Sequence, residues 1–188
     1  LSLTVCAKPL TITGVSVNNK TYDGSTSATL SNTGQLEGVV SSDNVKLVTT
    51  YATATFDNRN VGKNKAVSCS GFTISGTSSS NYNLIQPTNI TANITPKELI
   101  ITGVKINNKI YDATTSATFS NKGSLNGVIN GDTVTLINTS TTAIFNNSNV
   151  GNNKNVTCSG FELSGTDASK YKLTQPTSNA NITPKELT

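Results

Sequence analysis

The amino-acid sequence predicts an all-β chain made of two tandem repeats, each a β-sandwich or a barrel. Apolar and polar residues alternate in short runs, the period-two pattern of strands with one buried face. Serine, threonine and asparagine fill 78 of the 188 positions, and these residues compete against long helices by hydrogen-bonding the nearby backbone. The pattern also occurs twice, since "LTITGVSVNNKTYDG" in the first half corresponds to "LIITGVKINNKIYDA" in the second. Such repetition indicates a repeat protein.

The strands of one repeat can be placed in chain order. Alternation runs from Leu10 to Val17 with a break at Gly14, and it continues over 45–56, with an equivalent run over 134–145. Val67 and Cys69 form another in-phase pair, after which Gly71 shifts the register as a β-bulge would. Turn chemistry separates these runs, at Asn18-Asn19, Asp23-Gly24, Asn60-Val61-Gly62 and Gly76 to Ser80. About six to eight short strands per repeat, with no helical window, predict a sandwich or barrel.

The repeat boundaries divide the chain into three parts. Residues 1–7 are expected to be the last strand of a preceding repeat or an N-terminal strand, 8–96 the first repeat, and 97–188 the second. Thr95-Pro96-Lys97 leads straight from the last strand of one repeat into the first strand of the next. Because proline holds the preceding residue extended, it stiffens this joint. Tandem units with such linkers predict an extended arrangement, with neighbouring repeats of the same chain as partners.

Charge and hydropathy argue against two classes of partner. The net charge is +4, but the 14 basic residues are scattered and only Arg59 is an arginine. Phosphate recognition usually shows clustered basic residues and stacking aromatics, so no nucleic-acid partner is expected. No apolar run approaches the roughly 20 residues of a membrane span, so we expect no membrane insertion by this segment.

Composition also argues against most catalysis. The chain contains no histidine, which removes imidazole-based nucleophilic triads, histidine-ligated zinc and imidazole proton transfer. The ten carboxylates are spread thinly, without a calcium-loop spacing or a close pair. We therefore expect no enzyme activity, no catalytic residue, no cofactor and no metal.

Two motifs resemble a known family. "NKTYDGSTSATL" and "NKIYDATTSATF" resemble the K-x-Y-D-G-T-T-x-A signature of the YDG repeat domain, and "NVGKNKAVSCSGF" with "NYNLIQPT" and "ITPKEL" resembles its second half. The resemblance covers essentially the whole chain, twice. It implies immunoglobulin-like β-sandwiches, found as tandem repeats in large bacterial surface and secreted proteins, including filamentous-haemagglutinin-like adhesins. Ala113 departs from the glycine of the signature, which suggests that the turn does not strictly need glycine. Cys69 and Cys158 stand where the family usually has valine.

The Tyr-Asp pairs, Tyr22-Asp23 and Tyr111-Asp112, are the strongest local candidates for a site. They are either ligand contacts, an aromatic face beside a carboxylate, or structural anchors in which the tyrosine is packed and the aspartate closes an Asx turn. A lysine precedes each tyrosine by two residues, on the same strand face. Extracellular sandwiches sometimes carry a Lys–Asn isopeptide bond, for which Lys20 with Asn93 and Lys109 with Asn181 supply the residue types; the alternative is a surface lysine packed along tyrosine.

The three cysteines are an odd number. Cys69 and Cys158 occupy equivalent positions and read as small apolar core residues. Cys6 has no counterpart, because Thr95 stands at its place in the second repeat. Outside the cell, a Cys6–Cys69 disulfide would be possible.

These observations together predict a non-enzymatic stalk module of an extracellular bacterial protein, surface-anchored or secreted, which projects other domains from the cell. Two alternatives remain open: an adhesive module that binds a glycan or host surface protein, and a filament subunit that assembles by strand addition through Leu1 to Val5.

Overall fold

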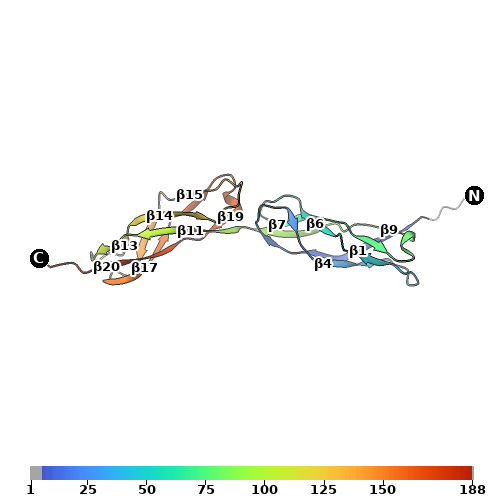
Figure 1. Cartoon of the computed structure of the whole chain (residues 1–188), viewed down its shortest axis with the longest axis horizontal. Helices are drawn as coiled ribbons and strands as arrows, with labels where there is room; N and C mark the ends of the chain where they lie inside the picture. Colours follow the sequence, from blue (N-terminus) through green and yellow to red (C-terminus); the bar gives the residue numbers. More distant parts are fainter. Residues whose placement is uncertain (1–5, 188) are drawn as a thin grey trace, which may run out of the picture. The chain divides into compact units, whose positions relative to one another are not determined.

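The computed structural model describes residues 6–187 and shows an all-β chain in two compact units, divided between Thr95 and Pro96. The predicted boundary lay one residue later. The expected strand at the start of the chain falls mostly on residues 1–5, which lie outside the described residues. Each unit is elongated along its strands, and in Figure 1 the chain enters the first unit at one end and leaves it at the other.

Over residues 6–95 the first unit contains ten strands, most of them short, and one 3-10 turn. They are β1 (Lys8–Val17), β2 (Lys20–Thr21), β3 (Ser27–Ala28), β4 (Leu30–Glu37), β5 (Lys46–Val48), β6 (Thr53–Phe56), β7 (Gly62–Ser70), β8 (Thr73–Ser75), η1 (Ser79–Asn81), β9 (Tyr82–Leu84) and β10 (Ile90–Thr95). Strands broken by turns were predicted and are found, but the structure has ten where about six to eight were expected. The difference arises from very short strands such as β2 and β3, which have two residues each.

The second unit repeats this order element by element. Its elements are β11 (Lys97–Ile106), β12 (Lys109–Ile110), β13 (Ser116–Ala117), β14 (Phe119–Asn126), β15 (Thr135–Ile137), β16 (Thr142–Phe145), β17 (Gly151–Ser159), β18 (Glu162–Ser164), η2 (Ala168–Lys170), β19 (Tyr171–Leu173) and β20 (Thr177–Thr183). A single residue, Pro96, separates β10 from β11.

Two sheets and a small ribbon form each unit. In the first unit the sheets have the orders β4-β1-β9 and β2-β10-β7-β6-β3, and β5 pairs with β8. The outer strands of the five-stranded sheet, β2 and β3, have two residues each. The chain passes directly between the two sheets from β1 into β2, from β3 into β4 and from β9 into β10. The Asn18 amide donates to the Thr29 carbonyl at 2.9 Å where the first two crossings meet. These shared corners give each unit a barrel-like form.

The core lies between the two sheets, where the alternating residues of the strands meet. In the first unit Leu10 is fully buried and Phe56 and Ile94 are 2% and 1% exposed. The equivalent core of the second unit contains Phe145, Val156, Cys158, Phe161 and Ile182, among others. Apolar burial of this kind is the main contribution to the stability of each unit.

The interpretation of Gly71 as a β-bulge was wrong. Gly71 lies between β7 and β8, which belong to different sheets, and so it marks a corner. Its left-handed φ of +81° is one that glycine adopts without penalty.

Candidate functional site: the Lys-x-Tyr-Asp corner

The Lys-x-Tyr-Asp segment turns the chain at the end of β2, and its lysine is held by internal contacts. The Lys20 ammonium lies 2.7 Å from Asp23 Oδ1 and 3.0 Å from both the carbonyl and the hydroxyl of Ser25. It also donates to the Ser27 carbonyl at 2.9 Å, and it lies 5.8 Å from the centroid of the Phe56 ring. An ammonium has three N–H donors, so the protein itself occupies all of them.

Asp23 completes the corner as an Asx turn. Its Oδ1 accepts a hydrogen bond from the Ser25 amide at 2.9 Å and another from the Ser25 hydroxyl at 3.0 Å. Partial burial works against ionisation of Asp23, but the Lys20 and Ser25 hydrogen bonds outweigh it and lower the pKa of the carboxyl below its usual value. The carboxylate is therefore held charged as an acceptor.

The second unit builds the same corner with different neighbours. The Lys109 ammonium lies 2.6 Å from Asp112 Oδ1 and donates to the Thr114 carbonyl and hydroxyl at 2.9 Å each. It also reaches the Ser116 carbonyl at 3.1 Å and lies 5.8 Å from the Phe145 ring. The hydrogen bond from Lys109 lowers the pKa of Asp112 to about 2.

The glycine of the motif is replaced in the second unit, but the backbone conformation is kept. Gly24 has a φ of +79° and Ala113 has a φ of +64°, both in the left-handed region. Alanine is strained there because its Cβ approaches the carbonyl oxygen. The turn therefore accepts alanine while retaining the conformation that favours glycine.

The two motif tyrosines differ in exposure. Tyr22 is 1% exposed and Tyr111 is 38% exposed, although the Tyr22 amide donates to the Thr95 carbonyl just as the Tyr111 amide donates to the Thr183 carbonyl. Tyr22 thus has the burial of a structural anchor, whereas part of the Tyr111 side chain faces solvent.

The structure does not bring the lysines and asparagines of the hypothetical isopeptide bonds together. Lys20 is the register partner of Ile94, so its side chain lies on the face of β10 opposite to that of Asn93. Asn93 Oδ1 instead accepts from the Asn64 amide at 2.8 Å. In the second unit Lys109 is likewise the partner of Ile182, and Asn181 Oδ1 accepts from the Asn153 amide at 2.8 Å.

All three cysteines are free thiols in this structure. Cys69 is buried in β7, where it pairs across the sheet with Ala54, while Cys6 is exposed ahead of β1. The disulfide considered between them is therefore not formed. Cys158 is fully buried in the second core, as expected for a small apolar residue.

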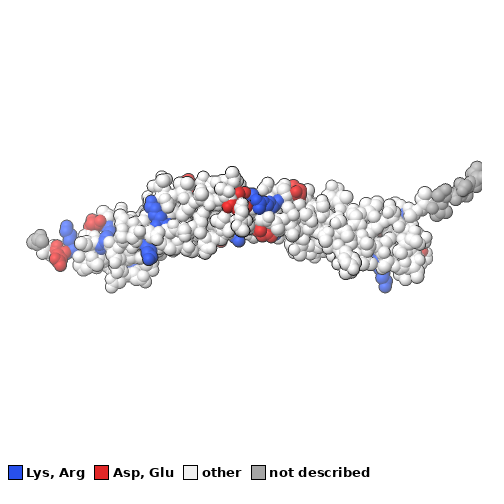
Figure 2. Space-filling model, turned by 45° about the horizontal axis from the view of Figure 1, so that its top comes forward, with Lys and Arg blue, Asp and Glu red and all other residues white. Residues whose placement is uncertain are grey.

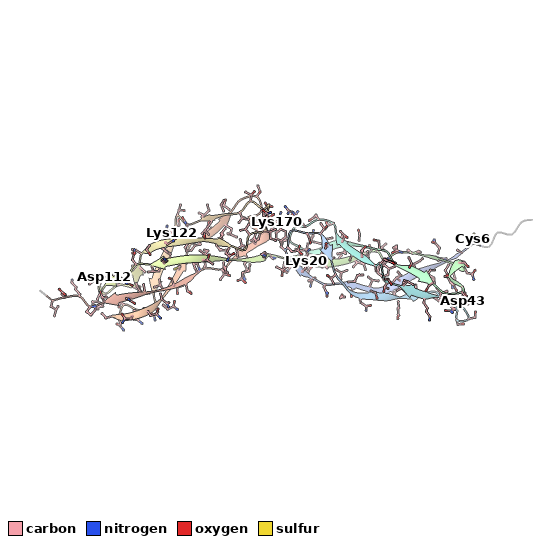
Figure 3. All side chains as sticks on the ribbon, viewed as in Figure 1. Cys6, Lys20, Asp43, Asp112, Lys122 and Lys170 are labelled. Atoms are coloured by element: carbon pink, nitrogen blue, oxygen red, sulfur yellow. The ribbon has the colours of Figure 1, made fainter. Side chains whose placement is uncertain are left out.

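A second polar contact, at the other end of the first unit from Lys20, was not predicted (Figure 3). The Tyr82 hydroxyl donates to Asp43 Oδ2 at 2.6 Å and accepts from the Val40 amide at 3.0 Å. Tyr171 makes the same contacts with Asp132 and with the Ile129 amide, at 2.6 and 3.0 Å. The recurrence of this Tyr–Asp pair in both repeats is the signal that could have revealed it.

The outer surface is polar and weakly charged. On the face drawn in Figure 2, charged side chains are few and lie between broad uncharged areas. Hydroxyls pair across the strands, as between Thr53 and Ser70 at 3.2 Å and between Thr142 and Ser159 at 2.8 Å. A hollow over β3 and β6 is lined by serine, threonine, alanine and leucine side chains only. It contains no titratable side chain that could act as an acid or base.

Residues 6–187 contain neither a metal-binding cluster nor a membrane-spanning helix. No three His, Cys, Asp or Glu side chains gather where they could hold a metal ion. No helix in this range has the length and apolar character needed to cross a bilayer.

The repeated strand order and the lysine-held corner in each unit define a tandem all-β repeat protein. The model of the YDG domain matches residues 6–91 and again 95–179, so the chain belongs to the YDG domain family. No curated protein matches the chain. No solved structure matches it either.

Proposed function

We propose that the chain is a non-enzymatic structural module, part of the stalk of an extracellular bacterial protein that projects other domains from the cell. The observation that carries the proposal is that the motif side chains are used internally. Lys20 and Asp23, like Lys109 and Asp112, bind each other and the adjoining turn. Because these side chains stabilise the fold of each repeat, they favour a structural role in which the number of repeats sets the length of the protein.

Three further observations support a stalk. Each unit is compact and has its own core, so further units can follow in the chain without changing the core of the existing ones. Only Pro96 separates β10 from β11, which leaves little free chain between repeats. Hydroxyl pairs such as Thr53 and Ser70 keep the sheet surface hydrated with little charge. The surface or secreted location, the adhesin context and the immunoglobulin-like topology rest on the family resemblance and belong to the same proposal.

One observation favours the adhesive alternative. Tyr111 is 38% exposed and Ile110 is 63% exposed, next to the Asp112 side chain, which is 54% exposed. An aromatic ring beside a carboxylate is a common way to contact a sugar or a partner protein. A glycan or host surface protein would be the partner.

Binding measurements separate the two functions. The two-unit chain is tested against an array of glycans and extracellular-matrix proteins, together with Tyr111→Ala. Tyr51→Ala is the matched control, because Tyr51 is 77% exposed and lies outside the motif. A stalk shows no saturable binding. Saturable binding lost in Tyr111→Ala but kept in Tyr51→Ala would overturn the stalk proposal and make the second unit an adhesive module.

The filament alternative concerns residues 1–5, which lie outside the described residues. Sedimentation of the chain at increasing concentration, with and without these five residues, tests it. Polymers that disappear on deletion would support strand addition in place of a simple stalk.

A further inference from the structure

The last strand of each unit is hydrogen-bonded in parallel to the continuation of the first strand. In the first unit β10 pairs with β2 through Ile94 with Lys20 and Thr95 with Thr21. Three side-chain and turn contacts extend this pairing, namely Tyr22 amide to Thr95 carbonyl at 2.8 Å, Thr95 hydroxyl to Lys20 carbonyl at 3.3 Å, and Asn93 amide to Asn19 Oδ1 at 2.7 Å.

The second unit reproduces every one of these contacts. β20 pairs with β12 in parallel, and the Tyr111 amide donates to the Thr183 carbonyl at 2.9 Å. The Thr183 hydroxyl donates to the Lys109 carbonyl at 3.3 Å, and the Asn181 amide to Asn108 Oδ1 at 2.8 Å. We name this set of contacts, in either unit, the terminal clamp.

Parallel pairing determines how tension along the chain acts on the terminal clamp. Tension pulls β1 backward along β9 and β4, with which it is paired. Through β1 it also pulls β2 backward along β10, while β10 is pulled forward through its last residue, Thr95. Two parallel neighbours pulled in opposite directions slide along each other, so all hydrogen bonds between them are loaded together. Antiparallel neighbours pulled apart at their adjoining ends would instead lose one pair at a time. Shearing therefore requires several bonds to break at once.

The lysine-held corner anchors the terminal clamp on its other side. Lys20 belongs to β2, and its ammonium binds Asp23, Ser25 and Ser27, which lead into β3 at the opposite edge of the same sheet. β2 has only two residues, so pairing with β10 alone would hold it weakly. The same corner occurs in both units, and in each it would help to hold the short strand in place when the chain is pulled. Since all three cysteines are free, no disulfide shares the load.

We propose that each unit is a load-bearing element, in which the terminal clamp converts tension along the chain into shear between its first and last strands. This inference rests on the proposed stalk function and adds a task to it: a stalk that transmits pulling forces has to resist unfolding, whereas a simple spacer does not.

Single-molecule force spectroscopy tests the proposal through a change of pulling direction. The whole two-unit chain is first stretched by its ends. It is then tethered through Cys6, which is exposed, and a thiol introduced by Glu37→Cys, while Cys69 and Cys158 stay buried. Glu37 is the antiparallel partner of Thr11, so this second geometry peels β1 from β4 pair by pair. The clamp predicts one-step unfolding at high force between the ends and a clearly lower force in the peeling geometry. Equal forces would overturn it.

Matched variants test the contacts themselves. Asn19→Ala and Asn108→Ala each remove one acceptor from a terminal clamp, and at a fixed force the unfolding rate of that unit should rise about five-fold. Thr53→Ala and Thr142→Ala remove a hydroxyl pair between strands that are not terminal, and should leave the rate unchanged. Equal effects in the two sets would overturn the proposal.

Weak mechanical resistance without ligand binding would overturn the load-bearing role but leave the spacer function intact. Saturable ligand binding would instead overturn the stalk proposal itself.

Discussion

Substitution of Gly160 by alanine should destabilise the second unit far more than the same change at Gly103. Both glycines have a φ of +79° and both are exposed, so alanine meets the same backbone strain at each. They differ in the space available to an added Cβ atom. A Cβ at Gly103 would have no atom within 4 Å, whereas a Cβ at Gly160 would lie 2.5 Å from the Ser140 carbonyl oxygen.

The expected free energies follow from these two effects. Left-handed strain costs an alanine about 1–2 kcal/mol relative to glycine. The lower entropy of the unfolded alanine chain offsets about 0.4–1 kcal/mol of this cost, so Gly103→Ala should cost about 0.5–1 kcal/mol. At Gly160 the Ser140 carbonyl must also retreat, and overpacking of this kind adds about 1–3 kcal/mol. Gly160→Ala should thus lower the free energy of unfolding by roughly 1.5–4 kcal/mol. For a unit of this size each kcal/mol lowers Tm by about 4–8 °C.

Urea unfolding followed by circular dichroism gives the two free-energy changes. Hydrogen exchange read by mass spectrometry assigns them to a unit, because peptides from 97–187 should lose protection while peptides from 8–95 keep it. Equal destabilisation by the two substitutions would refute the reasoning, since it would mean that the close approach of the Ser140 carbonyl has no energetic consequence.

Three further predictions concern the motif and the thiols. Ala113→Gly should stabilise the second unit by about 0.5–1 kcal/mol in denaturant unfolding, because relief of left-handed strain exceeds the extra entropy of unfolded glycine; a loss of stability would contradict this. The pKa of Asp112 falls from 3.8 to about 2 on folding. The stabilising effect of this carboxylate is therefore complete above pH 3.8 and is lost as the pH falls toward 2. Asp112→Asn should flatten the dependence of the free energy of unfolding on pH in this acid range, and an unchanged dependence would contradict the prediction. A thiol reagent should label Cys6 in the native protein but Cys69 and Cys158 only after denaturation, because both are buried and burial raises the pKa of each thiol; labelling of all three at one rate by mass spectrometry would disprove it.

The all-β class and the repeat could be predicted because both depend on local pattern. The alternation from Leu10 to Val17, that over 45–56 and the pair Val67 and Cys69 fall on β1, on β5 with β6, and on β7. The buried residues of β1, β6 and β7 are spaced by two, namely Leu10 and Ile12, Ala54 and Phe56, and Val67 and Cys69. The strands β2 and β3 have two residues each, too few to show an alternating pattern in the sequence. They are defined only by their pairing with other strands in the folded chain. β2 pairs with residues more than 70 positions away, as between Lys20 and Ile94, and β3 pairs with β6, as between Ser27 and Thr55.

The candidate site shows the same division. The Asx turn at Asp23 follows from a residue type and its near neighbours, and it could be anticipated from the sequence. The position of the Lys20 ammonium near Phe56 could not, because the two residues lie on different strands, β2 and β6, and only the folded chain brings their side chains together. The isopeptide hypothesis combined suitable residue types without register information. Register places Lys20 beside Ile94, and therefore on the face of β10 that Asn93 does not share.

The edge strands of the five-stranded sheets have only two residues each, and this also affects how such a chain avoids exchanging strands between its units. Similar neighbours on one polypeptide meet at high local concentration, and exchange of strands between them is a characteristic failure of repeat proteins. Pairing with a foreign strand needs a long edge of free amides and carbonyls, and β2 and β3 offer only two residues each. Along its five-stranded sheet, a folded unit therefore offers little for the strands of a pulled-open neighbour to pair with, which favours refolding of the opened unit upon its own strands.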